Sequence, residues 1–292
     1  MEIGKIAVLG GDLRTIYLAN ALCREGYSVT QLYLEDNGRL SPQVQKENSA
    51  QEAAKWCSTV VLPVPVFKDN RLNAPLCREA IELWPVLDKI PKGTLVLGGL
   101  MPQTLCRRLD ELGLPWVDLL EREELTVDNA AYTAEGALAV AMAESPRAIL
   151  GSDCVVVGYG HIGRILARYL AALGAHVTVT ARRPEHYSWI RLEGYTPWPT
   201  AKVGEVLGQA DFVFNTVPHL VLNEDALIRS NRSAIIIDLA SRPGGVDFDY
   251  AAQMGLKTVW ALSLPGKVTP QSAGESIAIT IQNILEERRA AQ

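Results

Sequence analysis

The sequence predicts an α/β fold built from two doubly wound domains, each with a mainly parallel sheet, joined by interdomain helices. Short apolar runs alternate with helical patterns along the whole chain, as they do in βαβ units. Glycine turns follow two of these runs, at Gly10-Gly11 and between Gly158 and Gly163. The length of 292 residues gives each of two domains room for its own core.

The first βαβ unit consists of a strand over 5–9, a helix over 13–25 that Gly26 ends, and a strand over 28–33. The turn after the first strand reads G-G-D-x-R, which is not a dinucleotide-binding pattern. The carboxylate of Asp12 would repel a pyrophosphate at this turn. We therefore expect the first domain to face a substrate.

The other elements of the first domain, residues 1–128, follow in order. A capping box from Ser49 to Glu52 predicts a helix that ends near Cys57. Pro63 stops a strand over 59–62, and a helix running to Leu87 is expected after a polar stretch over 68–75. A strand over 94–97, a helix over 102–112 and a strand over 116–118 complete the domain.

Two helices are expected to join the domains. An alanine-rich helix over 126–145 suits an element that crosses the cleft between them. The second domain is expected to span 129–269, including this helix. The last helix, over 273–289 within the segment 270–292, is expected to return to the first domain.

The most informative stretch runs from Cys154 to Arg164 and reads C-V-V-V-G-Y-G-H-I-G-R. A buried strand leads into Gly158, Gly160 and Gly163, and a helix follows to Leu173. This strand–turn–helix context predicts a Rossmann-like dinucleotide site, in which the glycines allow a tight turn, approach of a pyrophosphate and close helix packing. The alternative is an ordinary glycine-rich turn. The residues of the turn expected to bind the cofactor are Gly158, Tyr159, Gly160, His161, Ile162 and Gly163.

The end of the next strand, over 176–180, indicates which dinucleotide binds. An NAD site would place an acid there for the ribose hydroxyls. The chain instead reads Thr180-Ala181-Arg182-Arg183, and guanidinium groups suit a 2′-phosphate. NADP is therefore predicted over NAD; the alternative is that the two arginines are a solvated pair.

Polar segments follow the later strands, over 212–215, 234–238 and 257–261, where ligands of open α/β sheets bind. These segments supply the remaining expected cofactor residues, which are Asn215, Thr216, Val217, Pro218, Leu239, Ala240 and Ser241.

The same segments resemble the D-2-hydroxyacid dehydrogenase family over residues 130–280. Arg242, in A-S-R-P-G-G-V-D, lies where that family places the arginine for the substrate carboxylate. Where the family has its acid–base histidine, this chain has Gln271, which cannot exchange a proton near neutral pH. His219 is an alternative, although a lone histidine beside a proline turn is more often structural.

A closer resemblance is to the A-subunit family of dipicolinate synthase and spans nearly the whole chain. It is carried by G-G-D-x-R, N-A-x-x-T-A-E-G-A, N-T-V-P, D-L-A-S-R-P-G-G-V-D-F and L-P-G-K-V-T-P-Q-S-A-G-E. The resemblance implies oxidation of a cyclic dihydro- or hydroxytetrahydrodipicolinate, from a branch of the lysine pathway, to dipicolinic acid. It also implies a partner, the B-subunit of dipicolinate synthase, and a place in the cytoplasm of the mother cell of a sporulating bacterium.

A substrate with two carboxylates needs cationic or N–H-rich anchors. Arg242, Lys267 and the backbone of Gly244-Gly245 are expected to hold one carboxylate, and Arg14 the other from across the cleft. Arg242 and Lys267 are also the expected catalytic residues, although Lys267 and Arg14 have the alternative of being surface charges. The further expected substrate residues are Gly11, Asp12, Thr133, Ser241 and Thr269. No general base stands out; Glu135 and Asp12 are candidates only as acids near the expected crevice.

Composition excludes other classes. A net charge of −5 argues against a nucleic-acid binder. No apolar run approaches the ~18 residues of a membrane helix, and the start lacks a signal-peptide pattern. The five scattered cysteines suit free thiols in a reducing cytoplasm, and no zinc site or other metal site is expected.

Two other functions stay open from the sequence. One is a hydroxyacid or amino-acid dehydrogenase with a rearranged catalytic set. The other is a nucleotide-binding regulatory protein whose chemistry resides in its partner, which the missing histidine favours. A homo-oligomer is expected only by analogy with two-domain dehydrogenases.

Overall fold

The structure is a computed structural model that describes residues 4–35, 38–47, 49–55 and 57–291. The chain divides into two compact units. Unit 1 comprises Met1–Asp128 and Thr269–Gln292, and unit 2 comprises Asn129–Val268.

Unit 1 contains a six-stranded parallel sheet with the order β3-β2-β1-β4-β7-β8. Its strands are β1 (Lys5–Leu9), β2 (Ser28–Leu32), β3 (Gln45–Lys46), β4 (Thr59–Val61), β7 (Leu95–Gly98) and β8 (Trp116–Asp118). Its helices are α1 (Leu13–Arg24), α2 (Ala50–Lys55), α3 (Trp84–Leu87), α4 (Gln103–Leu112), η1 (Leu119–Glu121) and α11 (Pro270–Ala290). A separate hairpin pairs β5 (Phe67–Lys68) with β6 (Arg71–Leu72).

Unit 2 contains a second six-stranded parallel sheet, with the order β11-β10-β9-β12-β13-β14. Its strands are β9 (Asp153–Val157), β10 (His176–Ala181), β11 (Thr196–Pro199), β12 (Phe212–Asn215), β13 (Ile235–Asp238) and β14 (Lys257–Trp260). Its helices are α6 (His161–Ala172), α7 (Pro184–Leu192), η2 (Thr200–Glu205), α8 (Glu224–Leu227), α9 (Phe248–Gln253) and α10 (Leu264–Val268). Helix α5 (Glu123–Glu144) begins in unit 1 and ends in unit 2.

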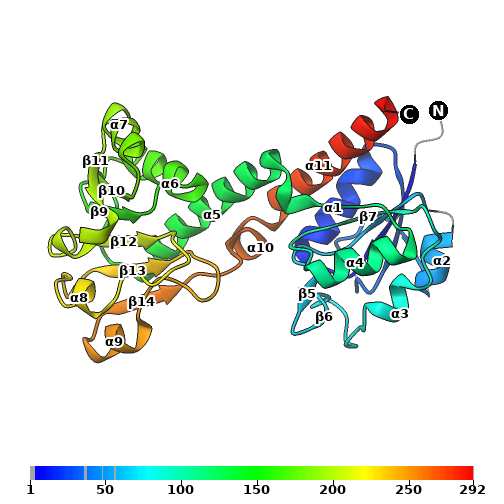
Figure 1. The fold of residues 1–292 in the computed structure, drawn as a ribbon, viewed down its shortest axis with the longest axis horizontal. Helices are drawn as coiled ribbons and strands as arrows, with labels where there is room; N and C mark the ends of the chain where they lie inside the picture. The colour runs from blue at the N-terminus through cyan, green and yellow to red at the C-terminus, as the bar shows by residue number, and fades with distance from the viewer. Residues whose placement is uncertain (1–3, 36–37, 48, 56, 292) are drawn as a thin grey trace. The chain divides into compact units, whose positions relative to one another are not determined.

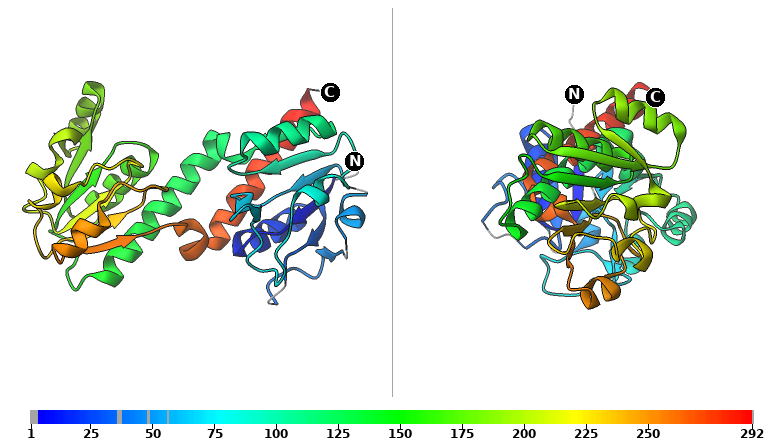
Figure 2. Two further views of the ribbon diagram at one scale, coloured as in Figure 1. Left: turned by 60° about the horizontal axis from the view of Figure 1, so that its bottom comes forward. Right: turned by 90° about the vertical axis from the view of Figure 1, so that its left-hand side faces the viewer.

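Each sheet is buried on both faces, which explains why its strands read as continuous apolar runs. In unit 2, Val156 and Phe214 pack in one core, while Val155 and Val213 pack in the other. Alternate side chains thus enter opposite layers, and Figures 1 and 2 show helices on both sides of each sheet. The prediction of an α/β fold with two mainly parallel sheets is confirmed.

Helix α11 packs against α1 in unit 1, as its red ribbon beside the blue one shows (Figure 1). A side chain at Gly274 would meet the Cβ of Tyr17 at 2.8 Å and the backbone nitrogen of Leu18 at 3.0 Å. Gly274 therefore allows the two helices to approach closely.

Some of the local predictions differ from the structure. The expected helix before Leu87 is wrong except for its last turn, α3, because Pro85 lies at the start of α3 and a proline cannot continue a helix from the preceding residues. The short edge strands β3 and β11 were not expected. The predicted capping box is confirmed, since Ser49 Oγ accepts the N–H of Glu52 at 3.1 Å. In the described parts of the chain, no helix has the length and apolar character needed to span a membrane.

Candidate functional site

The strand order of unit 2 reverses at β9, which has β10 on one side and β12 on the other. Ligands of open α/β sheets bind at this point, outside the carboxyl ends of the strands. The glycine turn from Gly158 to Gly163 follows β9 here. The carboxyl end of β12 adjoins it, because Thr216 Oγ1 donates to the carbonyl oxygen of Val157 at 2.9 Å.

The three glycines of this turn each meet a different steric requirement. Gly158 has a φ of +103°, and a side chain there would meet Thr216 Oγ1 at 2.5 Å. A Cβ at Gly163 would collide with the carbonyl oxygen of Gly158. At Gly160, in contrast, no atom lies within 4 Å of the position that a Cβ would take. Gly158 and Gly163 are thus required by the fold, whereas Gly160 leaves space open.

The open space at Gly160 suits a phosphate. Gly160 is the N-cap residue of the 12-residue helix α6, and no side chain caps this helix. The amino end of a helix offers N–H donors and the positive end of the helix dipole to an anion. The residues present therefore fit the pyrophosphate of a nicotinamide dinucleotide.

Of the residues between the glycines, Tyr159 does not contribute its side chain to this space. The Tyr159 side chain is buried, with its ring centroid 5.4 Å from that of His186 and 4.8 Å from the guanidinium carbon of Arg164. Burial, and then the nearby Glu193, raise the pKa of its phenol. Tyr159 thus packs between α6 and α7, while His161 is exposed and Ile162 is half-buried at the start of α6.

The end of β10 separates buried residues from exposed ones. Thr180 is fully buried, and its hydroxyl contacts the hydroxyl of Thr200 at 3.2 Å. Gly158 donates its N–H to the carbonyl oxygen of Thr180 at 3.1 Å. Thr180 therefore positions the glycine turn, and its contact with a cofactor stays a prediction. Arg182 and Arg183, which follow Ala181, are both exposed.

A hydrogen-bond network centred on Asp238 holds the loops after β12 and β13. Asp238 is fully buried, and its carboxylate accepts from Asn215 Nδ2 at 2.8 Å, from the N–H of Ala240 at 3.0 Å and from the N–H of Gly245 at 2.8 Å. Asn215 is fully buried too, and also accepts the N–H of Val217 at 3.1 Å. Both side chains therefore shape the crevice without facing it, and Leu239 and Ala240 are also buried.

Sequence reasoning missed the role of Asp238. Its only signal was a single carboxylate at the end of the otherwise aliphatic strand Ile235–Asp238. A buried carboxylate requires hydrogen-bond donors, but the sequence does not show where they come from.

The backbone N–H groups of Gly244 and Gly245, which were expected to hold a substrate carboxylate, have partners within their own loop. The N–H of Gly244 donates to the carbonyl oxygen of Ser241 at 2.8 Å, and that of Gly245 to Asp238. Both glycines are buried. These two donors are occupied within the loop, so neither N–H is open to a substrate in this conformation, and their role as substrate anchors stays a prediction.

Arg242 and Lys267 are exposed cations of unit 2. The guanidinium carbon of Arg242 lies 5.9 Å from the centroid of the Trp260 ring, and Trp260 Nε1 donates to Ala240 at 3.0 Å. Lys267 lies in α10. In the described ranges, no carboxylate pairs with either side chain, so both charges are available to an anionic ligand.

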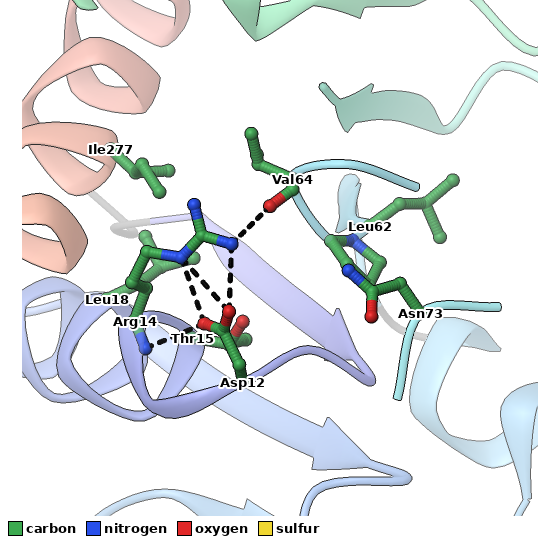
Figure 3. Close-up of a pocket in the computed structure, with 9 residues that line it drawn as sticks. Asp12, Arg14, Thr15, Leu18, Leu62, Val64, Asn73 and Ile277 are labelled. Atoms are coloured by element: carbon green, nitrogen blue, oxygen red, sulfur yellow. Dashed lines mark hydrogen bonds and ion pairs between the residues drawn. The ribbon is translucent and has the colours of Figure 1, made fainter. Parts of the chain in front are cut away.

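The crevice of unit 1 is filled by its own side chains. Asp12 lies three residues after the end of β1 and is the N-cap of α1, the position that Gly160 holds after β9 and before α6. The Asp12 carboxylate accepts the N–H of Arg14 at 3.0 Å, so a fixed negative group stands at this helix end (Figure 3).

Arg14 is held by the same carboxylate. Its Nε and one terminal nitrogen donate to Asp12 at distances of 2.8–3.2 Å, and that terminal nitrogen also donates to the carbonyl oxygen of Val64 at 2.5 Å (Figure 3). The cavity beside them, bounded also by Asn73 and Ile277, has a volume of about 10 Å³, room for one water molecule. Arg14 is thus already paired with Asp12, and its role as an anchor for a substrate carboxylate stays a prediction.

The remaining predicted residues lie in different units. Gly11, Asp12, Arg14 and Thr269 belong to unit 1, and Thr133 belongs to unit 2. The Thr133 hydroxyl donates to the carbonyl oxygen of Asn129 at 2.7 Å, within its own helix, so its proton is not free for a substrate. Gln271 lies in α11 and donates to Glu275 at 3.3 Å.

Comparison with known proteins assigns the two halves. Residues 5–120 match the family model described as the N-terminal domain of the dipicolinate synthase A-subunit. Residues 125–250 match the model described as the D-isomer specific 2-hydroxyacid dehydrogenase, NAD binding domain. The second match supports binding of NAD or NADP by unit 2 without distinguishing between them.

Whole-chain relatives agree with these matches. The A-subunit of dipicolinate synthase from Bacillus subtilis (strain 168) is 30% identical over 290 residues, which are 99% of this chain and 98% of that protein. Its crystal structure superposes with a TM-score of 0.88 at 30% identity, covering 100% of this chain and 98% of that one. The structure of the A-subunit from Bacillus halodurans gives a TM-score of 0.88 at 28% identity, covering 98% and 99%. The resemblance drawn from the sequence motifs is thus confirmed, and the chain belongs to the A-subunit family of dipicolinate synthase.

Proposed function

We propose that this chain oxidises a cyclic dihydro- or 4-hydroxytetrahydrodipicolinate to dipicolinic acid, with NADP⁺ as the hydride acceptor. The observation that carries the proposal is the similarity to the dipicolinate synthase A-subunit over 99% of the chain. The open glycine turn at the amino end of α6 supports it, because an oxidoreductase of this class needs a dinucleotide site.

The proposed cofactor would rest on groups of unit 2 alone. When bound, this cofactor would accept the hydride from the substrate. The N–H groups at the start of α6 receive its pyrophosphate, and Gly160 leaves the space for it. Arg182 and Arg183 favour a 2′-phosphate, because they stand directly after β10, where an NAD site has a carboxylate to bind the ribose diol.

The proposed substrate carries two carboxylates and becomes aromatic on oxidation, so the protein mainly has to hold the ring and accept a proton. Arg242 and Lys267 are proposed as its cationic anchors and, through that contact, as catalytic residues. The hydroxyls of Ser241 and Thr269 are proposed to contact the substrate. A proton acceptor is not assigned: glutamine at position 271 cannot serve, and His219 is exposed on the loop after β12.

The proposal includes the setting that the family implies. The chain would act with the B-subunit of dipicolinate synthase in the cytoplasm of the mother cell during sporulation, on a branch of the lysine pathway, and would form a homo-oligomer. A regulatory, non-catalytic role is the second candidate, and the observation that favours it is Gln271 in place of an acid–base histidine.

The test is the absorbance at 340 nm of the purified chain with NADP⁺ or NAD⁺ and freshly prepared hydroxytetrahydrodipicolinate, with and without a candidate B-subunit. NADPH formation by the chain alone, lost in Arg242→Ala, is the result that the proposal predicts. NADPH formation only with the partner would mean that the partner completes the active site.

Two results would reject the proposal. Turnover of simple 2-keto acids in place of the cyclic substrate would favour a hydroxyacid dehydrogenase. Tight NADP⁺ binding without absorbance change in either mixture would favour the regulatory role.

A further inference from the structure

A pocket of about 480 Å³ opens in unit 2. Its walls come from the residue after β10, from η2 after β11, and from the segment after β12 that runs through α8 to Arg229. All three are continuations of strand carboxyl ends, where ligands of such sheets bind. Strands β9, β10 and β11 form the first mononucleotide half of the sheet, which takes the adenosine part of a dinucleotide.

Three cations line this pocket, each from a different wall. They are Arg182 after β10, Lys202 in η2 and Arg229 after α8. All three are exposed, and among the residues that the structure describes none has an ion-pair partner for its side chain. The Arg229 side chain packs beside Gly204, since a Cβ at Gly204 would lie 3.3 Å from Arg229 Cδ.

Arg183 differs from these three. It does not line the pocket, its side chain is 72% exposed, and it lies 3.9 Å from Glu185. Of the two adjacent arginines, Arg182 is therefore the one that the fold directs to the pocket wall.

We propose that this pocket binds the 2′-phosphate of the adenosine ribose, and that Lys202 and Arg229 act with Arg182 to select NADP over NAD. The inference rests on the proposed function and adds two specificity residues to it. A phosphomonoester carries about −1.5 to −2 charges at pH 7 and has three acceptor oxygens. Three cations from separate elements offer positive charge and donors for these three oxygens, whereas a ribose diol is uncharged and needs no cation.

Two carboxylates, Glu205 and Asp225, also line the pocket. Glu205 ends η2, and Asp225 lies in the first turn of α8. The lining side chains therefore carry three positive and two negative charges. An NAD site would use a carboxylate to bind the ribose diol. The alternative is therefore that Glu205 or Asp225 binds the ribose diol of NAD in this pocket.

The experiment compares two probes that lack nicotinamide, 2′,5′-ADP and 5′-AMP, by isothermal titration calorimetry on the full chain. Lys202→Gln and Arg229→Gln are each expected to weaken 2′,5′-ADP binding by roughly tenfold or more, because each removes a charge-assisted hydrogen bond. Binding of 5′-AMP is expected to change less than about twofold. The matched control is Arg191→Gln, an exposed arginine of α7 that bonds Ser188 and lies outside the pocket.

The outcomes separate the inference from the proposed function. If wild type prefers 2′,5′-ADP and only Arg182→Gln weakens it, the three-cation pocket is overturned while NADP as cofactor stands. If wild type binds both probes equally, NADP specificity and the pocket both fail. If Glu205→Gln or Asp225→Asn weakens 5′-AMP binding while the Lys202 and Arg229 variants leave 2′,5′-ADP unaffected, the pocket holds a ribose diol and the inference is wrong.

Discussion

Gly160 and Asp12 occupy the same position in two βα turns, three residues beyond the first strand of each sheet. At Gly160 the space for a side chain is empty, whereas at Asp12 a carboxylate fills it and binds the N–H of Arg14. A single residue therefore decides whether the helix end is open to a phosphate.

Gly160→Val is expected to weaken nucleotide binding without destabilising the fold. The φ of Gly160 is −85°, which valine adopts, and its Cβ would meet no protein atom. The side chain would stand where the pyrophosphate approaches, so affinity for NADP⁺ should fall by roughly tenfold or more in calorimetry, with Tm unchanged.

Gly163→Ala provides the contrast. Its Cβ would collide with the backbone of Gly158, so the helix must move away from the strand. We expect the free energy of unfolding to fall by about 1–3 kcal/mol in urea denaturation. Equal stability of Gly163→Ala and wild type would show that α6 does not pack this closely against the backbone of Gly158.

The buried Asp238 carboxylate makes its own prediction. Asp238→Asn places an amide N–H₂ against N–H donors from Asn215, Ala240 or Gly245, so at least one donor loses its acceptor. The expected loss is about 2–4 kcal/mol of unfolding free energy, measured by urea denaturation. Asp249→Asn, at an exposed position of α9, is the control. A loss no larger than that of the control would mean that the network does not stabilise the loops.

At the scale of elements, an ion-pair cluster ties α11 to the start of α5. Arg122 donates to both carboxylate oxygens of Glu287, at 2.8 and 2.6 Å, and also pairs with Glu124 at 2.8 Å. Hydrogen bonds from Arg122 lower the pKa of both carboxyl groups. These pairs are largely exposed, so their contribution is small.

The sign of the pKa shifts sets the pH dependence. Carboxyl groups with a lowered folded pKa stabilise the fold above their unfolded pKa, about 4.3, and lose this as pH falls through the folded values. Arg122→Gln should therefore lower Tm by no more than about 2 °C at pH 7, and the difference from wild type should shrink below about pH 4. Arg107→Gln, an exposed change in α4, is the control. A difference that stays constant from pH 7 to pH 3 would contradict this account.

Helices, strands and turns could be predicted where the glycine or hydrophobic pattern of the sequence was clear. The glycine turn after β9 and the apolar strands of both sheets follow from local sequence, since their burial on two faces leaves a continuous apolar signal. Strand β11 was not predictable, because Pro197 and Pro199 disfavour a strand and only pairing with β10 at the sheet edge permits it.

Some residues of the candidate site could also be predicted from the sequence, and others could not. Arg182 was predictable from its distance beyond the fingerprint glycines. Lys202 and Arg229 were not, because only the fold brings η2 and the end of α8 to one pocket. The pairing of Arg14 with Asp12 was also missed, since two nearby charges in a turn give no indication of whether they bind each other or a ligand.

At the scale of the whole molecule, the sheets of the two units share one strand order. In each, the third strand along the chain lies at an edge of the sheet, β3 in unit 1 and β11 in unit 2. Their equivalent turns differ in chemistry. Unit 2 has an open helix end and a separate pocket of about 480 Å³ lined by Arg182, η2 and the segment after β12, whereas unit 1 has a cavity of about 10 Å³ beside the Asp12–Arg14 ion pair. The same topology thus carries an open helix end in unit 2 and a helix end capped by Asp12 in unit 1, which illustrates that a site depends on its residues and not on the fold alone.

The measurement that tests this central claim most directly is the stoichiometry of NADP⁺ binding to the purified full-length chain by calorimetry. We expect one nucleotide per chain for wild type, and binding weakened by roughly tenfold or more in Gly160→Val. Two nucleotides per wild-type chain, or wild-type affinity in Gly160→Val, would contradict this expectation.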